Sequence, residues 1–251
     1  MKPPRYEVIG VEGIGEVRPG DDVAALIVDA AAQQRTPLVA GDVVVISQKI
    51  VSKSEGRLVR LTDVTPTPAA LSMAGHLDRD PRLVEVILRE SRRIVRMDRG
   101  ILIAETHHGW VCANAGVDQS NVDRDAVALL PEDPDRSART VRERLRERAG
   151  GDVAVIVADT FGRPWREGLT NIAIGVSGIA PLQSYLGQRD PAGRELQATI
   201  LALADEVAGA AELVMGKLAR IPVALVRGLD LPPGEQGSKP LLRDPARDLF
   251  R

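Results

Sequence analysis

The residues best suited to catalysis follow an aliphatic segment in the second half of the chain. The run Val153–Ala158 is followed directly by Asp159, then by Thr160 and by two arginines, Arg163 and Arg166. Carboxylate and hydroxyl oxygens beside guanidinium groups suit a Mg²⁺ or Mn²⁺ ion that bridges phosphate oxygens. The structural alternative is that Asp159 caps the N-terminus of a following helix. Packing explains the segment poorly, so we interpret it as the centre of a site for a phosphorylated ligand.

Two further segments place polar side chains next to predicted strand ends. Lys49 and Lys53 are four residues apart, so they share one face of a helix or lie in a loop that closes over an anion. Exposed lysines are usually solvated, which is the competing interpretation of this pair. The segment 116–121 contains Asp118 and is rich in turn-forming residues. Taken alone, such a segment is more often a simple turn whose Asx side chains bond to their own backbone.

The sequence lacks the motifs of common nucleotide and zinc sites. The run Gly13–Glu16 has no third glycine of a dinucleotide-binding fingerprint, and no glycine-rich loop ends in Lys-Ser or Lys-Thr. A bound nucleotide would therefore not be held by a P-loop. The histidines His76, His107 and His108 lack metalloprotease spacing, and Cys112 has no second cysteine with which to bind structural zinc.

Composition narrows the classes of partner. The 251 residues are 44% hydrophobic and 27% charged, which is enough to bury a core in one large domain or in two interleaved lobes. A formal net charge of −2 and few aromatic residues provide neither a basic field nor a stacking platform for nucleic acid. No segment approaches the roughly 20 apolar residues of a membrane span. With a single cysteine, Cys112, we expect a cytoplasmic protein without nucleic-acid or membrane partners.

The elements that must position these residues can be predicted from apolar runs and turn residues. We expect strands over residues 43–47, 153–158 and 222–227, with a hairpin or edge strands over 99–112. We expect helices over residues 81–94, 138–148 and 197–218, and a surface or partner-contacting tail from Pro232. The order of elements is compatible with an α+β or a mixed α/β protein. Our prediction is an α+β fold of mixed sheets with helices, in which two interleaved lobes form one domain without a P-loop.

Five segments together resemble the coenzyme F420-0:L-glutamate ligase family, and the resemblance runs over nearly the whole chain. In order, they are Gly13–Asp22, Val51–Arg57, Gly116–Val122, Asp159–Arg163 and Ala211–Lys217. Each is weak alone, but their order and spacing are specific as a set. In the actinobacterial version this domain is fused to a flavin-binding, nitroreductase-like domain. Because this chain stops at Arg251, we expect one ligase domain over residues 1–251 and no flavin domain.

The resemblance implies a GTP-dependent ligase that joins a carboxylate of coenzyme F420-0, a deazaflavin phospholactate, to the amine of L-glutamate. Further additions would give a γ-linked tail. It implies phosphoryl transfer from GTP to the acceptor carboxylate, followed by attack of the amine on the acyl phosphate. One or two Mg²⁺ or Mn²⁺ ions would neutralise the charge on the transferred group, and K⁺ is a further candidate cation. A homodimer is implied as well.

The resemblance also implies residue roles. Asp118 and Asp159 would hold one divalent ion, and Thr160 would bind a second. Asp118, Asp159 and Lys53 would be the catalytic residues. Residues expected to contact the nucleotide are Ile14, Gly15, Glu16, Val17, Gln48, Lys53, Asn121, Met215, Gly216 and Lys217.

One position departs from the pattern of archaeal members, which supply an acidic or amide ligand of the second ion after the Met-Gly pair. Here that position is Lys217, and a protonated ammonium cannot coordinate a metal. We expect Lys217 to touch phosphate directly and to replace part of the charge of the ion. Asp205 and Glu212 share a helix face nearby, and we expect both to be solvated charges rather than substitute ligands.

Other functions remain compatible with the same residues. The chain could be a related carboxylate–amine ligase or a GTP hydrolase, because a fold does not fix its substrate. It could also be an inactive nucleotide-binding protein in which Lys217 has abolished turnover. The presence of Asp118, Asp159, Thr160 and Lys53 argues against an inactive protein.

Overall fold

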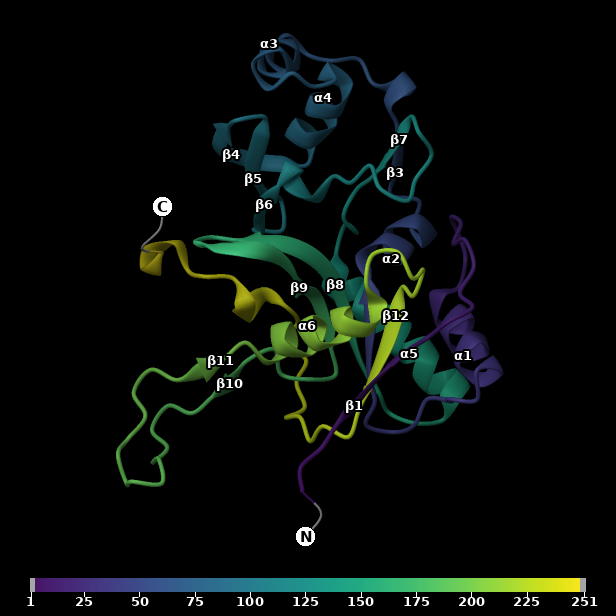
Figure 1. Ribbon diagram of the computed structural model, residues 1–251, viewed down its shortest axis with the longest axis vertical. Coiled ribbons are helices and arrows are strands. Elements are labelled where there is room, and N and C mark those ends of the chain that lie inside the picture. Colours follow the sequence, from purple (N-terminus) through teal and green to yellow (C-terminus); the bar gives the residue numbers. More distant parts are fainter. Residues whose placement is uncertain (1–2, 249–251) are drawn as a thin grey trace.

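A five-stranded sheet forms the centre of the structure, a computed structural model that describes residues 3–248 (Figure 1). Its strands are, in spatial order, β1 (Glu7–Gly10), β12 (Val223–Arg227), β2 (Val43–Ser47), β8 (Ala154–Arg163) and β9 (Arg166–Ser177). Neighbouring strands are antiparallel, except that β2 and β8 are parallel. The expected strands over 43–47 and 222–227 are therefore confirmed to within a residue.

Helices cover both faces of this sheet, which explains the continuous aliphatic sequences of β2 and β8. One face packs against α1 (Val23–Gln33), α2 (Gln48–Ser54) and α5 (Pro134–Ala149) through inward residues such as Val44 and Val155. The opposite face packs against α6 (Leu203–Met215) through Val45 and Ile156. We call the sheet with these four helices the body. Among residues 3–248, no helix combines the length and the apolar character needed to cross a bilayer.

A second hydrophobic core lies in a small lobe inserted between α2 and α5 (Figure 1). The chain leaves the body after α2 and returns to it at α5, so the two lobes are interleaved as predicted, and the fold is α+β. The helices of the small lobe are α3 (Pro68–Leu77) and α4 (Pro81–Arg89). Its strands are β3 (Leu58–Arg60), β4 (Ser91–Asp98), β5 (Ile101–Thr106), β6 (Val111–Ala113) and β7 (Ala126–Ala128).

Short elements complete the described chain. The 3₁₀ turns are η1 (Leu61–Asp63), η2 (Asn114–Gly116), η3 (Lys239–Leu241) and η4 (Pro245–Arg247), and a small hairpin joins β10 (Gln183–Ser184) to β11 (Ile200–Leu201). We expected the tail from Pro232 to be a surface or partner-contacting segment, but part of it is buried. Ser238 is buried, its Oγ donates to the carbonyl oxygen of Ile174, and the side chains of Leu241 and Leu242 pack against the core.

Several predicted boundaries are wrong for local reasons. The helix expected over 81–94 ends at Arg89, because the following residues form β4 against β5. The helix expected over 197–218 starts at Leu203 and ends at Met215, because Gly216 follows with a positive φ of 55°. The helix expected over 138–148 is longer, since Asp133 caps its start and Gly150 its end. The hairpin expected over 99–112 is confirmed as β5 and β6.

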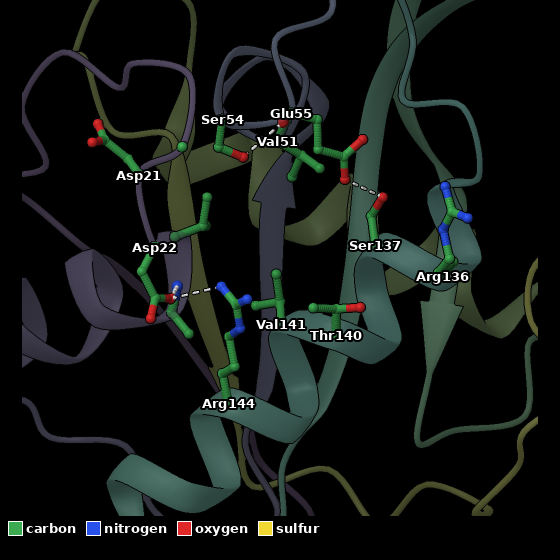
Figure 2. A pocket seen from close by; sticks show the side chains of 13 residues that line it. Asp21, Asp22, Val51, Ser54, Glu55, Arg136, Ser137, Thr140, Val141 and Arg144 are labelled. Carbon is green, nitrogen blue, oxygen red and sulfur yellow. Dashed lines mark hydrogen bonds and ion pairs between the residues drawn. The ribbon is translucent and has the colours of Figure 1, made fainter.

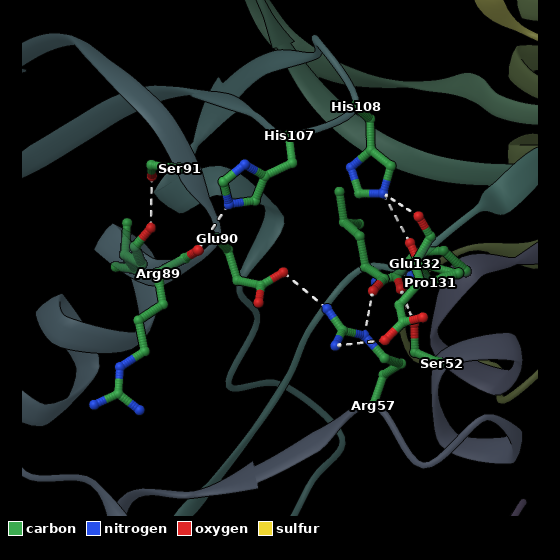
Figure 3. A network of polar contacts seen from close by, with 12 residues as sticks. Ser52, Arg57, Arg89, Glu90, Ser91, His107, His108, Pro131 and Glu132 are labelled. Atoms are coloured by element: carbon green, nitrogen blue, oxygen red, sulfur yellow. Dashed lines mark hydrogen bonds and ion pairs between the residues drawn. The ribbon is translucent and has the colours of Figure 1, made fainter.

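A polar network fixes the small lobe to the body, as Figure 3 shows. Arg57 donates to the carbonyl oxygen of Leu130 at 2.9 Å and forms an ion pair with Glu90 at 2.8 Å. His108, in the turn between β5 and β6, contacts the carbonyl oxygens of Pro131 and Glu132 through Nε2, at 2.9 and 3.0 Å. A carbonyl oxygen only accepts, so Nε2 carries the proton. These contacts set the position of the lobe just before the chain enters α5.

Stability should depend strongly on the contact between β9 and the start of α5. A Cβ at Gly175 would lie 2.2 Å from the carbonyl oxygen of Pro134, which is backbone and cannot rotate away. We therefore expect Gly175→Ala to lower the free energy of unfolding by roughly 1–3 kcal/mol in urea denaturation. The control is Gly209→Ala in α6, where the nearest atom is 3.7 Å away. The control should be neutral or stabilise by up to about 1 kcal/mol, and equal losses would contradict the packing argument.

Candidate functional site

Two carboxylates from different lobes meet where β8 leaves the body core. Asp118 belongs to the small lobe and is held beside β7 by reciprocal backbone hydrogen bonds with Ala128. Its carboxylate forms an ion pair with Lys49 of α2 at 2.9 Å and accepts the N–H of Ser120 at 2.7 Å. Burial alone would raise the pKa of Asp118, but the hydrogen bonds from Lys49 and Ser120 hold it below its usual value. Asp118 is therefore ionised at neutral pH.

Asp159 is the most strongly perturbed carboxylate of the site. Burial raises the pKa of Asp159 to about 6, and the negative charge of Asp118 raises it as well. A hydrogen bond from the N–H of Thr160 and the ammonium groups of Lys49 and Lys217 act in the opposite direction. Asp159 thus lies within electrostatic range of one like charge and two opposite charges. Such a pair of carboxylates with separated pKa values is typical of a catalytic or metal-binding site.

The strand around Asp159 differs from our expectation. We expected the strand over Val153–Ala158 to end at Asp159. Instead, β8 continues to Arg163, and its residues 159–163 pair with β9. No helix starts at Asp159, so the helix-capping interpretation of this residue is wrong. Because successive side chains of a strand point to opposite faces, Asp159 and Thr160 face different surroundings. Their neighbours agree with this, since Asp159 lies near Cys112 and Thr160 contacts Lys217.

A second polar cluster surrounds Thr160 on the side of α6. Thr160 Oγ1 donates to Asn171 Oδ1 at 2.7 Å and accepts from Lys217 Nζ at 2.5 Å. The same ammonium pairs with Glu212 at 2.9 Å. We expected Glu212 to be a solvated charge, but it forms an ion pair with Lys217 instead. Lys217 lies among side-chain oxygens, which is where a cation is most stable.

The third group of expected residues joins α2 to the loop after β1. Lys53 is buried in α2 and forms an ion pair with Glu16 of that loop. Gln48 is also buried, and its Oε1 accepts from Ser52 at 2.8 Å. Its Nε2 has no hydrogen-bond partner among the described residues. A buried donor without an acceptor costs free energy, so this amide is suited to a ligand that brings one.

The remaining expected residues differ in what they can contact. Val17 and Met215 are buried in the core, so only their backbone atoms can reach a ligand. Ile14 and Gly15 lie in the same loop as Glu16 and are at least partly exposed. Asn121 is exposed with a φ of 58° and follows Asp118 in its loop, and Gly216 ends α6 next to Lys217.

The oxygen ligands present are few and hard. Among residues 3–248, no three His, Cys, Asp or Glu side chains gather as a metal cluster. Asp118 and Asp159 offer two carboxylates, and Thr160 offers a hydroxyl oxygen. Mg²⁺ is commonly held by one or two carboxylates, with the remaining positions filled by water and phosphate oxygens. Cys112 is buried, and burial and the charge of Asp159 raise its pKa to about 12. It is therefore a small buried hydrophobic residue rather than a thiolate ligand.

Two cavities can be compared as binding sites for the substrates. The helix cavity, of about 260 Å³, lies between α1, α2 and α5 and is lined by charged residues that include Asp22, Glu55 and Arg144 (Figure 2). The sheet-edge cavity, of about 210 Å³, lies beside β9 under the tail and is lined by Trp110, Phe161 and Ile172, among others. Only the sheet-edge cavity includes residues of β8 and β9 in its lining.

Three residues of the site were not identified as functional from sequence. Lys49 was singled out only as half of a lysine pair, although its ion pair with Asp118 makes it part of the site. Asn171 gave no signal, because nothing in the sequence indicates that it lies opposite Thr160 in the hairpin. Asp205 was expected to be a solvated charge, but its Oδ1 accepts the N–H of Ala173 at 2.9 Å and burial raises its pKa.

Comparison of the sequence with known proteins places the chain in a family. A model of the family described as F420-0:Gamma-glutamyl ligase matches residues 13–228. The chain is 46% identical to the coenzyme F420:L-glutamate ligase of Methanothermobacter thermautotrophicus, over 97% of this chain and 98% of that protein. It is 49% identical to the protein of the same name from Methanopyrus kandleri, over 94% of each. The chain therefore belongs to the F420-0:gamma-glutamyl ligase family.

Proposed function

We propose that the protein forms an amide bond between coenzyme F420-0 and L-glutamate, driven by GTP and dependent on a divalent cation. The observation that carries the proposal is the pair Asp118 and Asp159, brought together from two lobes and flanked by the ammonium groups of Lys49 and Lys217. This arrangement can hold a metal and a polyphosphate, and it occurs in a chain of this family. The names of its relatives support the acceptor and the amino acid.

The residues present fit a Mg²⁺ or Mn²⁺ ion. Asp118 and Asp159 would hold it, and it would supply charge neutralisation for phosphoryl transfer. The raised pKa of Asp159 supports this assignment, because a buried carboxylate beside a like charge is stabilised by a nearby cation. Asp159 would lose its proton when the cation binds. K⁺ is a further candidate cation, and measurements of activity against metal concentration should include it.

The side chains of the chain suit a two-step reaction. In the first step, an acceptor carboxylate oxygen attacks the γ-phosphorus of GTP, the bond to the β-γ bridging oxygen breaks, and an acyl phosphate and GDP form. In the second step, the neutral amine of glutamate attacks the acyl carbon, phosphate leaves, and one proton is released. Lys53, with Glu16, and Gln48 would position the nucleotide, and the Gln48 Nε2 would donate to it.

Lys217 would replace part of the charge of a second ion. Its ammonium lies between Thr160 Oγ1 and Glu212, which are hard oxygens of the kind that bind a divalent cation. An ammonium there can also donate to a phosphate oxygen. A related carboxylate–amine ligase or a GTP hydrolase remains a second candidate, because the same groups would serve either reaction.

We also propose a homodimer. The family resemblance implies this assembly, and Leu169 on β9 and Leu213 on α6, which are 68% and 87% exposed, offer apolar surface that an interface would bury. A stable dimer should bury at least about 1,600 Å² in total.

Replacement of either site carboxylate should abolish ligation. We expect Asp118→Asn and Asp159→Asn each to lower the rate by about 100-fold or more, because each removes a charge that would hold the metal. Mass spectrometry of the acceptor measures added glutamyl units, and a phosphate assay measures GTP cleavage with and without the two co-substrates. Cleavage that requires both indicates a ligase, and cleavage without them indicates a hydrolase. The control is Asp29→Asn, an exposed carboxylate of α1, and near-normal turnover of either site variant would refute the assignment.

The stability of Asp159→Asn separates lost chemistry from a damaged fold. The folded-state pKa of about 6 lies above the ordinary value of 3.8, so ionisation of this group costs stability as pH rises from about 4 through 6. The amide carries no charge. In metal-free buffer, the inactive variant should therefore be more stable than the wild type at neutral pH, and this gain should disappear below about pH 4. Denaturant unfolding at several pH values measures both.

Lys217 should affect the requirements for GTP and metal together. If its ammonium contacts phosphate, Lys217→Ala should raise the KM for GTP several-fold, about tenfold if a charged hydrogen bond is lost, and should steepen the dependence on divalent ion. Lys217→Glu should recover activity mainly at high Mn²⁺. The control is Lys239→Ala in the tail, an exposed lysine. Superimposable metal titrations for all four proteins would remove Lys217 from the site.

The dimer should be disrupted by one charge on the exposed part of β9. We expect light scattering at micromolar concentration to show a dimer for the wild type and a folded monomer for Leu169→Glu, because a buried, unpaired carboxylate opposes association. Leu71→Glu, on the exposed face of α3, is the matched control and should stay dimeric. A monomeric wild type would overturn the proposal.

A further inference from the structure

The sheet-edge cavity combines an apolar wall with two opposite charges. Its volume of about 210 Å³ is below the roughly 300–1,000 Å³ of sites for drug-sized ligands, so it suits a small metabolite. The apolar lining comes from the body, the small lobe and the tail, and the charged groups come from α6 and the tail. The residues that matter below are Trp110, Phe161, Ile172, Leu242, Asp205 and Arg243.

This cavity adjoins Asp159, one of the two carboxylates proposed to hold the metal. Ile172 is the cross-strand partner of Asp159 in the β8–β9 ladder, and directly opposed residues have Cβ atoms about 4.5–5.5 Å apart. Phe161 is two residues after Asp159 on the same strand, so both side chains point to the same face. Val111, in the cavity wall, directly precedes Cys112, whose pKa is affected by the charge of Asp159. Three parts of the wall therefore border the site of phosphoryl transfer.

The charges of the cavity match an amino acid. Asp205 Oδ1 accepts the N–H of Ala173 at 2.9 Å, which holds the carboxylate in place and leaves Oδ2 as an acceptor for an ammonium group. The guanidinium of Arg243 is a fork-shaped donor suited to a carboxylate. Between them, aromatic and aliphatic side chains would contact methylene groups. An anionic nucleotide is a poor fit, because it would bring phosphates close to Asp205.

The helix cavity is the rival location, but it lies among helices and away from the β8–β9 ladder. Figure 2 shows the ion pair of Asp22 with Arg144 and the hydrogen bond that Ser137 donates to Glu55. Asp22 also forms an ion pair with Arg148. Its lining includes no residue of β8 or β9. A ligand there would not adjoin Asp159 through the β8–β9 ladder.

We infer that the sheet-edge cavity is the subsite for the incoming L-glutamate, with Asp205 binding its α-ammonium group and Arg243 binding a carboxylate. The inference rests on the proposed ligase function and adds the location of its second substrate. An amino acid held there presents its nitrogen beside the carboxylates that would organise the acyl phosphate, and it becomes a nucleophile once the ammonium group has given one proton to the Asp205 carboxylate. Such positioning makes the second step effectively unimolecular.

Steady-state kinetics tests the two charges separately. Asp205→Asn keeps an oxygen for the N–H of Ala173, so the variant should fold. We expect Asp205→Asn and Arg243→Gln each to raise the KM for L-glutamate at least about tenfold, as expected for loss of a charge-assisted hydrogen bond, with the KM for GTP unchanged. Arg243→Lys should recover part of the loss. The control is Arg136→Gln in the helix cavity, and a wild-type KM for glutamate in both sheet-edge variants would overturn the inference.

A binding measurement separates this inference from the proposed function. Titration of L-glutamate, with a non-hydrolysable GTP analogue and Mg²⁺ present, should shift the indole N–H resonance of Trp110 and leave that of Trp165, which does not line the cavity. Glutarate lacks the amine, so Asp205→Asn should weaken glutamate but not glutarate, whereas Arg243→Gln should weaken both. A Trp110 shift without turnover would support the subsite and refute the ligase. Turnover with no shift and unchanged KM values would refute the subsite alone.

Discussion

Asp118 and Asp159 place two carboxyl groups within electrostatic range of each other in a partly buried site. The surrounding residues determine how strongly the two groups repel each other. Lys49 neutralises Asp118 directly, while Asp159 is left with a pKa raised to about 6. This arrangement lowers the stability of the free protein and makes the binding free energy of a cation more favourable. Burial of Asp159 and the negative charge of Asp118 both raise this pKa, whereas the N–H of Thr160 and the ammonium groups of Lys49 and Lys217 lower it.

The two carboxylates depend on contacts between the lobes because they come from different ones. Asp118 lies in the inserted small lobe, and Asp159 lies in the sheet of the body. Arg57 and His108 contact carbonyl oxygens just before α5, and Arg57 also forms an ion pair with Glu90 at the end of α4. A shift of the lobe would change the separation of the two charges, and hence both the pKa of Asp159 and the geometry available to a metal. Contacts outside the site therefore control its electrostatics.

Sequence predicted those parts of the fold that local patterns determine. The aliphatic runs of β2 and β12 and the hairpin of β5 and β6 were predicted because each pattern has few structural solutions. The extension of β8 past Asp159 was not, since it depends on pairing with the polar, exposed start of β9. The ion pair of Lys49 with Asp118 and the contacts of Asp205 join residues far apart in sequence, so no spacing rule reveals them. The family resemblance identified the candidate residues, whereas the structure shows which side chains share an environment.

The interleaving of the lobes also constrains how the chain folds during synthesis. The first strand, β1, pairs with β12, so that Glu7 lies opposite Arg227. The central parallel pair, β2 with β8, closes over the entire small lobe. The lobe itself contains mostly local pairings and can form as soon as its own segment has left the ribosome. Strand β1 must wait for β12 near the end of the chain, and β2 lacks both neighbours until β8 has been made, so their edges are open to association with other chains until then. Translation rate and chaperone capacity should therefore affect the yield of this protein.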